Sequence, residues 1–85
     1  MPEISRFMGM VIQMYYRDHV LPHIHIRDAE TTCTIDLDGN ILGGKLPLHK
    51  LHIIQRWMTL HKKELERNWN LVKDKELPER IAPWE

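Results

Sequence analysis

The chain has 85 residues, which is enough for one small domain and leaves no room for a second. Twelve Lys and Arg residues balance twelve Asp and Glu residues, so the net charge gives no argument for bulk attraction to nucleic acid or to a membrane. No apolar run approaches the roughly 20 residues of a membrane span, and one cysteine, Cys33, cannot form an internal disulfide. We therefore expect a cytoplasmic protein with a buried thiol and no membrane partner.

The first 46 residues follow the two-residue period of β-strands. Strands are predicted over residues 10–16, 23–27 and 31–37, because β-branched and aromatic residues are frequent there and apolar residues alternate with polar ones. A turn at residues 38–40 and a short strand at 41–44 follow. These segments predict an antiparallel meander of three or four strands.

The second half of the chain follows a helical period. Pro47 suits a first helical turn, and neither Gly nor Pro interrupts residues 48–73. Residues at spacings of three and four form one helical stripe, made of the apolar Leu51, Ile54, Met58 and Leu65 together with His61. A single helix of this length would exceed the common range, so two helices with a bend near 61–63 are favoured over one.

These segments predict a single α+β domain over residues 1–85. It consists of a β-meander at 1–46 packed on a helical layer of one or two helices at 47–74, followed by a polar tail at 75–85. The tail is expected to pack loosely because it is polar and contains proline.

The segment DHVLPHIHIRD, residues 18–28, has three histidines within seven positions. A two-residue turn at 29–30 would pair the strands at 23–27 and 31–37 in a register that places apolar residues opposite apolar ones. The pairs that this register predicts are His23–Asp36, Ile24–Ile35, His25–Thr34 and Ile26–Cys33. The same parity places Tyr15 beside His23 and Gln13 beside His25. Both imidazoles are then expected outside the core, on the sheet face that the helices do not cover.

One reading of this face is a metal-independent endoribonuclease. His23 would act as the base, held by Asp36, and His25 or His19 as the acid, because imidazole titrates near neutral pH. Guanidinium or ammonium groups would hold phosphate, and a tyrosine would stack on a base. The candidate catalytic residues are His19, His23, His25, Asp36 and Tyr15, and the candidate substrate-binding residues are Arg17, Arg27, Lys45 and Tyr16.

Two other readings of the same face stay open. His19, His23, His25 and Asp36 are the residues that would bind a metal ion, but a bare H-x-H pair is a weak signal, and we expect no metal or other cofactor. An ordinary polar or partner-binding surface is the alternative. His49 and His52 are expected on a solvated helix face. The sequence GGKLP at 43–47 lacks the spacing and the Ser or Thr of a P-loop.

Several motifs together carry a family resemblance. They are MPEISRF at 1–7, MYY at 14–16, DH at 18–19, PH at 22–23, His25, TIDL at 34–37, GKLP at 44–47, Trp57, LH at 60–61 and NW at 68–69. These motifs resemble those of the domain-of-unknown-function 4160 family of small bacterial proteins. Leu21 and Ile24 depart from its pattern, which usually has a second proline and an aromatic residue at these positions.

The resemblance implies a bacterial cytoplasmic protein whose gene lies beside a second small gene, and hence a small cognate protein as partner. We expect a component of a toxin–antitoxin-type two-gene system. It would be either an endoribonuclease toxin or a non-catalytic interaction module, antitoxin-like or an adaptor, with a histidine-based metal-binding protein as a further alternative. RNA and a second copy of the chain are the other partners considered, and enzymatic activity is left open.

Overall fold

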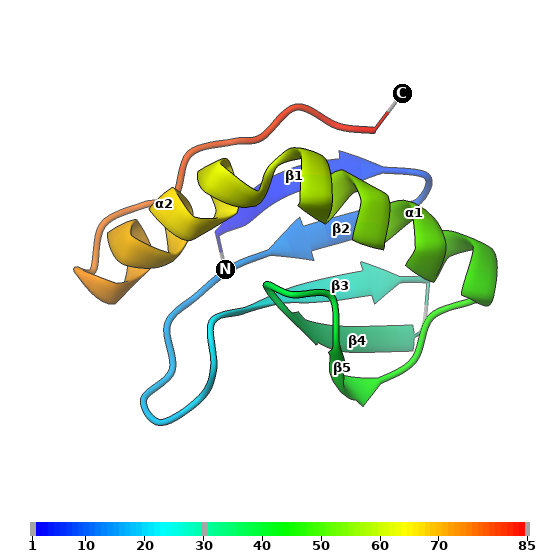
Figure 1. The fold of residues 1–85 in the computed structure, drawn as a ribbon, viewed down its shortest axis with the longest axis horizontal. Coiled ribbons are helices and arrows are strands. Elements are labelled where there is room, and N and C mark those ends of the chain that lie inside the picture. Colours follow the sequence, from blue (N-terminus) through cyan, green and yellow to red (C-terminus); the bar gives the residue numbers. More distant parts are fainter. Residues whose placement is uncertain (1, 30, 85) are drawn as a thin grey trace.

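Five antiparallel strands precede two helices in the computed structural model, which describes residues 2–29 and 31–84. The strands are β1 (Glu3–Phe7), β2 (Met10–Gln13), β3 (His23–Asp28), β4 (Thr31–Asp36) and β5 (Ile41–Gly44), and they pair in chain order as a meander. Helices α1 (Leu48–Leu60) and α2 (Lys62–Lys73) lie over one face of the sheet (Figure 1). The predicted α+β class and its order of elements are confirmed, with one strand more than expected.

The additional strand is β1, which the sequence pattern did not reveal. The pairing of β1 with β2 is irregular between Glu3 and Ser5, so that the neighbours Ile4 and Ser5 are both buried. Two consecutive buried residues break the alternation by which a strand is recognised in a sequence. Strand β2 also ends at Gln13, three residues earlier than predicted.

The core lies between the sheet and the helices. Strands β3 and β4 pair in the predicted register, with Ile24 opposite Ile35 and Ile26 opposite Cys33. These side chains are buried together with residues of both helices, including Trp57. The Cys33 thiol is 1% exposed, as predicted for a structural cysteine, and burial raises its pKa.

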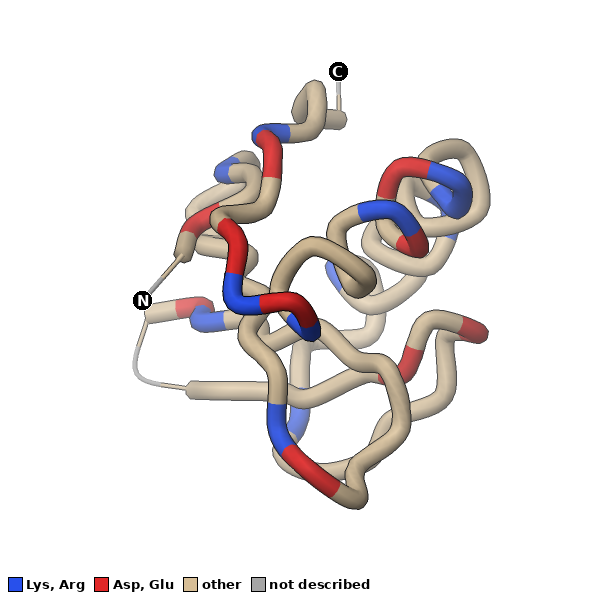
Figure 2. Tube along the Cα trace, turned by 90° about the vertical axis from the view of Figure 1, so that its left-hand side faces the viewer, with Lys and Arg blue, Asp and Glu red and all other residues tan. Residues whose placement is uncertain are grey.

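The helical layer consists of two helices, as favoured from the sequence. His61 separates them and adopts a non-helical φ of −112°. An ion pair between Lys50 and Asp28, with an Nζ–Oδ1 distance of 2.6 Å, joins α1 to the end of β3. Basic and acidic residues are interspersed along the chain (Figure 2). Within residues 2–29 and 31–84, no helix is long and apolar enough to cross a membrane.

The C-terminal segment, residues 74–84, does not form the loosely packed tail that was expected. It runs back along the β1 edge of the sheet (Figure 1), where the Ile81 amide donates to the Ile4 carbonyl oxygen at 2.7 Å. Ile81 is buried, and the Asn68 side chain both donates to and accepts from the backbone of Glu79 at 2.8 Å. The prediction was wrong because hydrogen bonds to backbone groups hold much of the segment, and such bonds cannot be predicted from amino-acid composition. Glu85 lies outside the described residues.

Candidate functional site

Tyr15, His23 and His25 form a cluster of three rings, here called the histidine–tyrosine cluster. Tyr15 stacks on His25 with the ring centroids 4.3 Å apart and the planes 8° from parallel. The two imidazoles meet edge to face at 4.8 Å, and Tyr15 lies 6.4 Å from His23. The pairing of Gln13 with His25 and of His23 with Asp36 is the predicted one. The two imidazoles are two residues apart on β3, and Tyr15, which follows the end of β2, stacks on His25, whereas the prediction placed it beside His23.

His23 does not lie on an open surface, which corrects the expectation that both imidazoles are outside the core. The residue is 1% exposed, and its ring lies 5.4 Å from the indole of Trp69 on α2. Its Nδ1 donates to the Leu21 carbonyl oxygen at 2.6 Å, which fixes the orientation of the ring. The alternation of side chains between the two faces of β3 was predicted correctly. His23 is nevertheless buried, because Trp69 of α2 covers its ring at the start of the strand.

His25 is half-buried and its imidazole favours the neutral form. Burial lowers its pKa, and the nearby His23 and Arg17 lower it further. Nδ1 lies 3.4 Å from the Thr34 hydroxyl, while Nε2 is buried without a hydrogen-bond partner among the described residues. A neutral imidazole with an unoccupied nitrogen can accept a proton or a hydrogen bond.

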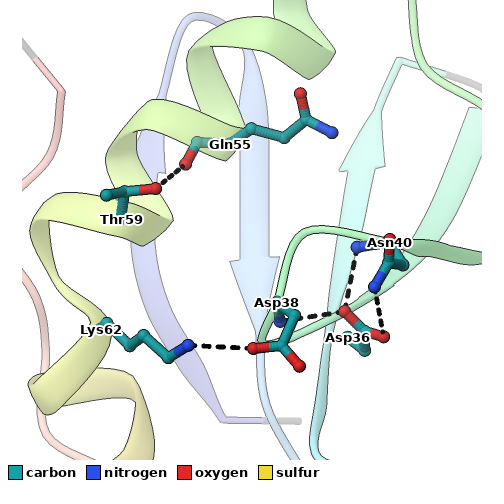
Figure 3. A network of polar contacts seen from close by, with 6 residues as sticks. All are labelled: Asp36, Asp38, Asn40, Gln55, Thr59 and Lys62. Carbon is teal, nitrogen blue, oxygen red and sulfur yellow. Dashed lines mark hydrogen bonds and ion pairs between the residues drawn. The ribbon is translucent and has the colours of Figure 1, made fainter.

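Asp36 does not orient His23, although the two residues pair across β3 and β4. Its carboxylate accepts hydrogen bonds from the Asp38 and Asn40 amides, both at 2.9 Å, and from the Asn40 side chain at 3.2 Å (Figure 3). Burial raises the pKa of Asp36, but these hydrogen bonds outweigh it and leave the pKa below its usual value. Asp36 therefore holds the turn after β4, which Lys62 reinforces through an ion pair with Asp38 at 2.9 Å.

The metal ligands considered from the sequence do not converge. His19 is exposed in the connection between β2 and β3, where its φ is +64°. Asp36 is committed to its turn, as described above. Among residues 2–29 and 31–84, no three or more His, Cys, Asp and Glu side chains form a group that could hold a metal ion.

The predicted phosphate-binding and stacking residues are divided between two ends of the sheet. Arg17 is close enough to His25 to affect its pKa, and Tyr16 contacts Trp69 with ring centroids 5.5 Å apart. Arg27 is exposed two residues beyond His25 on β3. The Lys45 amide donates to the Thr32 carbonyl oxygen, at the end of the sheet away from His23. Arg17 and Tyr16 thus lie near the cluster and Lys45 does not.

Two surface features lie outside the candidate site residues proposed from the sequence. One is the outer edge of β5, whose residues Ile41–Gly44 are all exposed. The other is a groove between α1 and the C-terminal segment, which includes His52 and Trp84. His52 was correctly placed on an exposed helix face. The groove itself could not be inferred, because it depends on the fold-back of the C-terminal segment.

Comparison with known proteins adds one finding. Neither the curated proteins nor the solved structures compared with the chain include a match. The family model of DUF4160, a domain of unknown function, matches residues 9–70, which include the histidine–tyrosine cluster and most of both helices. Since this match covers more than half of the 85 residues, the chain belongs to the DUF4160 family.

Proposed function

We propose that the chain is the partner-binding component of a bacterial toxin–antitoxin-type two-gene system, and that its small cognate protein binds at β5. One observation carries this proposal: within the residues that the structure describes, β5 is a sheet edge that no charged side chain of its own, no proline and no covering segment protects. All four residues Ile41–Gly44 are exposed, and none is charged or a proline. An exposed edge strand is a template for pairing with another chain, and proteins usually block it with charges, proline or a covering segment.

The opposite edge of the sheet is protected in the way that β5 is not. The C-terminal segment covers β1 through the hydrogen bond from Ile81 to Ile4. Charged side chains add to this protection, because Glu3 pairs with Arg6 at 2.7 Å and with Arg80 at 3.0 Å. Of the two edges in the described part of the chain, β5 is the one that remains available for a partner.

The chemistry of β5 indicates what kind of segment would bind. Ile41 and Leu42 are 45% and 43% exposed, so two neighbouring large apolar side chains of the edge strand are accessible to a partner. At Gly43, nothing lies within 4 Å of the position that a Cβ atom would occupy. An extended partner segment with apolar side chains could add a strand here, gaining backbone hydrogen bonds and contacts with both residues. The family resemblance supports the product of the neighbouring gene as that partner.

The proposal is tested by expressing the chain together with the neighbouring gene product. We expect one stable complex by size-exclusion chromatography with light scattering. Leu42→Lys places a charge on the edge and should weaken the complex about tenfold or more, since burying an unpaired charge is costly. Leu60→Lys makes the same change at a leucine of α1 that is 69% exposed, and it should bind as the wild type does.

Three results would overturn the assignment of β5. They are a wild-type chain that forms no complex, equal weakening by Leu42→Lys and Leu60→Lys, and a homodimer that Leu42→Lys dissociates while the complex with the cognate protein persists. The last result would show that a second copy of the chain, not the cognate protein, occupies the edge.

A second candidate function is a metal-independent endoribonuclease toxin. It is favoured by the neutral imidazole of His25, which stacks on Tyr15 and has Arg17 nearby. A neutral imidazole suits a general base for the 2′-hydroxyl of RNA, but the buried Nε2 of His25 would first have to become accessible to the substrate. The burial of His23 and the use of Asp36 in a turn remove two members of the predicted set, so partner binding is the better supported role.

The two functions can be separated by growth assays. If the chain is a ribonuclease toxin, its expression alone arrests growth. His25→Ala should then abolish the arrest while the protein stays folded, whereas Gln13→Ala, its neighbour across β2 and β3, should not. Arrest that persists in folded His25→Ala excludes this imidazole as the base.

A further inference from the structure

The groove between α1 and the C-terminal segment has a volume of about 510 Å³, within the range of small-molecule sites. The residues that line it are His52, Ile53, Gln55, Arg56, Thr59 and Trp84. It lies apart from the histidine–tyrosine cluster and from β5, and shares no residue with either. A ligand that binds in this groove would therefore serve a function other than partner binding at β5.

The polar side of the groove comes from one face of α1. His52, Gln55, Arg56 and Thr59 are spaced at i, i+3, i+4 and i+7, which places them on the same side of the helix. Gln55 already donates to the Gly39 carbonyl oxygen, and Thr59 donates to the carbonyl oxygen of Gln55. The remaining donors are Arg56 and His52, both exposed.

The charge of the groove favours an anion. Among residues 2–29 and 31–84, no carboxylate lines the groove and no ion pair to Arg56 forms. A guanidinium group presents several N–H donors in a planar fork that fits two oxygens of a phosphate. His52, one helical turn away, can donate to the same group.

The other side of the groove is an indole held in place by the fold. Trp84 is half-buried and packs against the core, as does Ile53. The backbone before Trp84 is held by hydrogen bonds at Ile81 and at Ala82, the second from the Trp57 indole at 2.8 Å. A fixed indole next to an apolar side chain suits the stacking of a planar aromatic ring.

We propose that this groove binds a nucleotide, with its phosphate on Arg56 and His52 and its base against Trp84. The recognised chemistry is a planar base linked to a terminal phosphate. A free nucleoside monophosphate and the 5′-phosphorylated end of a single-stranded RNA both carry it.

The test is calorimetric titration of the full chain with adenosine monophosphate, and in parallel with adenosine and with inorganic phosphate. The mononucleotide should bind at least about tenfold more tightly than either part, because stacking and phosphate binding then act together. Arg56→Ala should weaken this binding about tenfold or more. Lys63→Ala removes a positive charge from an exposed position of α2 and should leave the affinity unchanged.

Two further measurements distinguish stacking from charge and identify the source of the ligand. Trp84→Leu keeps an apolar side chain at the core and should lose affinity, with folding checked by circular dichroism. Quenching of tryptophan fluorescence in the wild type gives a second readout of stacking. A 5′-phosphorylated RNA oligonucleotide that binds more tightly than the mononucleotide identifies nucleic acid as the ligand, and equal affinities identify the free nucleotide.

Other outcomes would overturn the inference. Absence of mononucleotide binding does so directly. Equal weakening by Arg56→Ala and Lys63→Ala would show that only general electrostatic attraction is at work. Inorganic phosphate that binds as tightly as the mononucleotide would show that the base makes no contact in the groove. None of these results depends on whether the cognate protein binds β5.

Discussion

The indole N–H of Trp57 donates a hydrogen bond to the Ala82 carbonyl oxygen at 2.8 Å and so ties the C-terminal segment to α1. The Trp57 side chain is completely buried, and its ring lies 5.3 Å from that of Phe7 on β1. One residue therefore joins the helical layer, the first strand and the last segment of the chain. This relationship makes the C-terminal segment part of the core, and the first two predictions follow from it.

Ile81→Ala should lower the free energy of unfolding by about 2–4 kcal/mol, because it removes a buried aliphatic side chain and leaves a cavity. Ile81 is 4% exposed. The matched control is Leu77→Ala in the same segment, where the side chain is 81% exposed and the change should stay within about 0.5 kcal/mol. Urea unfolding measures both. Similar effects of the two substitutions would show that the segment is not held in the core.

Asn68→Ala should lower the free energy of unfolding by about 2–3 kcal/mol. The side chain is 1% exposed and makes two hydrogen bonds of 2.8 Å to the Glu79 backbone, so its loss leaves an amide and a carbonyl group without their partner. Asn70→Ala, at an exposed position of the same helix, is the control and should have little effect. If thermal and urea unfolding give Asn68→Ala and Asn70→Ala the same stability, the hydrogen bonds between Asn68 and Glu79 do not stabilise the fold.

His25 should make the stability of the protein depend on pH near neutrality. Its pKa in the folded state lies below the usual 6.5, mainly because of burial and also because of His23 and Arg17. The unfolded chain therefore binds the proton more tightly, and the free energy of unfolding should fall as the pH is lowered through about 6.5.

The pH prediction is checked by urea unfolding between pH 5 and pH 8, and His25→Gln should reduce the slope in this window. The control, His49→Gln, removes an exposed histidine of α1 and should retain it. A slope that His25→Gln leaves unchanged would assign the pH dependence to other groups.

Gly44→Ala should be strongly destabilising, whereas Gly43→Ala should be nearly neutral. Gly44 has a φ of +75°, and an added Cβ atom would lie 2.1 Å from the Thr32 carbonyl oxygen. The backbone conformation alone costs about 1–3 kcal/mol for a residue with a side chain, and the steric clash adds to it. At Gly43 the added methyl group meets nothing within 4 Å. Thermal unfolding of the two variants would contradict this account if their midpoints agreed.

Local pattern was sufficient for much of the fold. The register of β3 and β4 followed from alternation, since one register alone pairs Ile24 with Ile35 and keeps the polar residues on the other face. The two helices followed from their apolar spacing, and their separation at His61 from their combined length. The same parity argument placed Tyr15 beside His23, whereas in the structure Tyr15 stacks on His25 at 4.3 Å and lies 6.4 Å from His23.

Other features depended on parts of the chain that are distant in sequence. The burial of His23 requires Trp69, which lies 46 positions further on and covers it only when α2 packs against the sheet. The register predicted that Asp36 lies opposite His23. It did not predict the turn that follows β4, where the carboxylate of Asp36 accepts hydrogen bonds from the Asp38 and Asn40 amides. The sequence thus predicted that His23 and Asp36 pair across the strands, but not how either side chain is buried or bonded.

The sequence by itself determined which residues share a strand face or a helix face, because side-chain direction is set by backbone period within one element. Only the tertiary structure decided which faces are covered. Coverage depends on where separate elements pack and on backbone hydrogen bonds, which form with almost any side chain and so leave no pattern in the sequence. The C-terminal segment illustrates this, since its amide at Ile81 closes the β1 edge while β5 stays open.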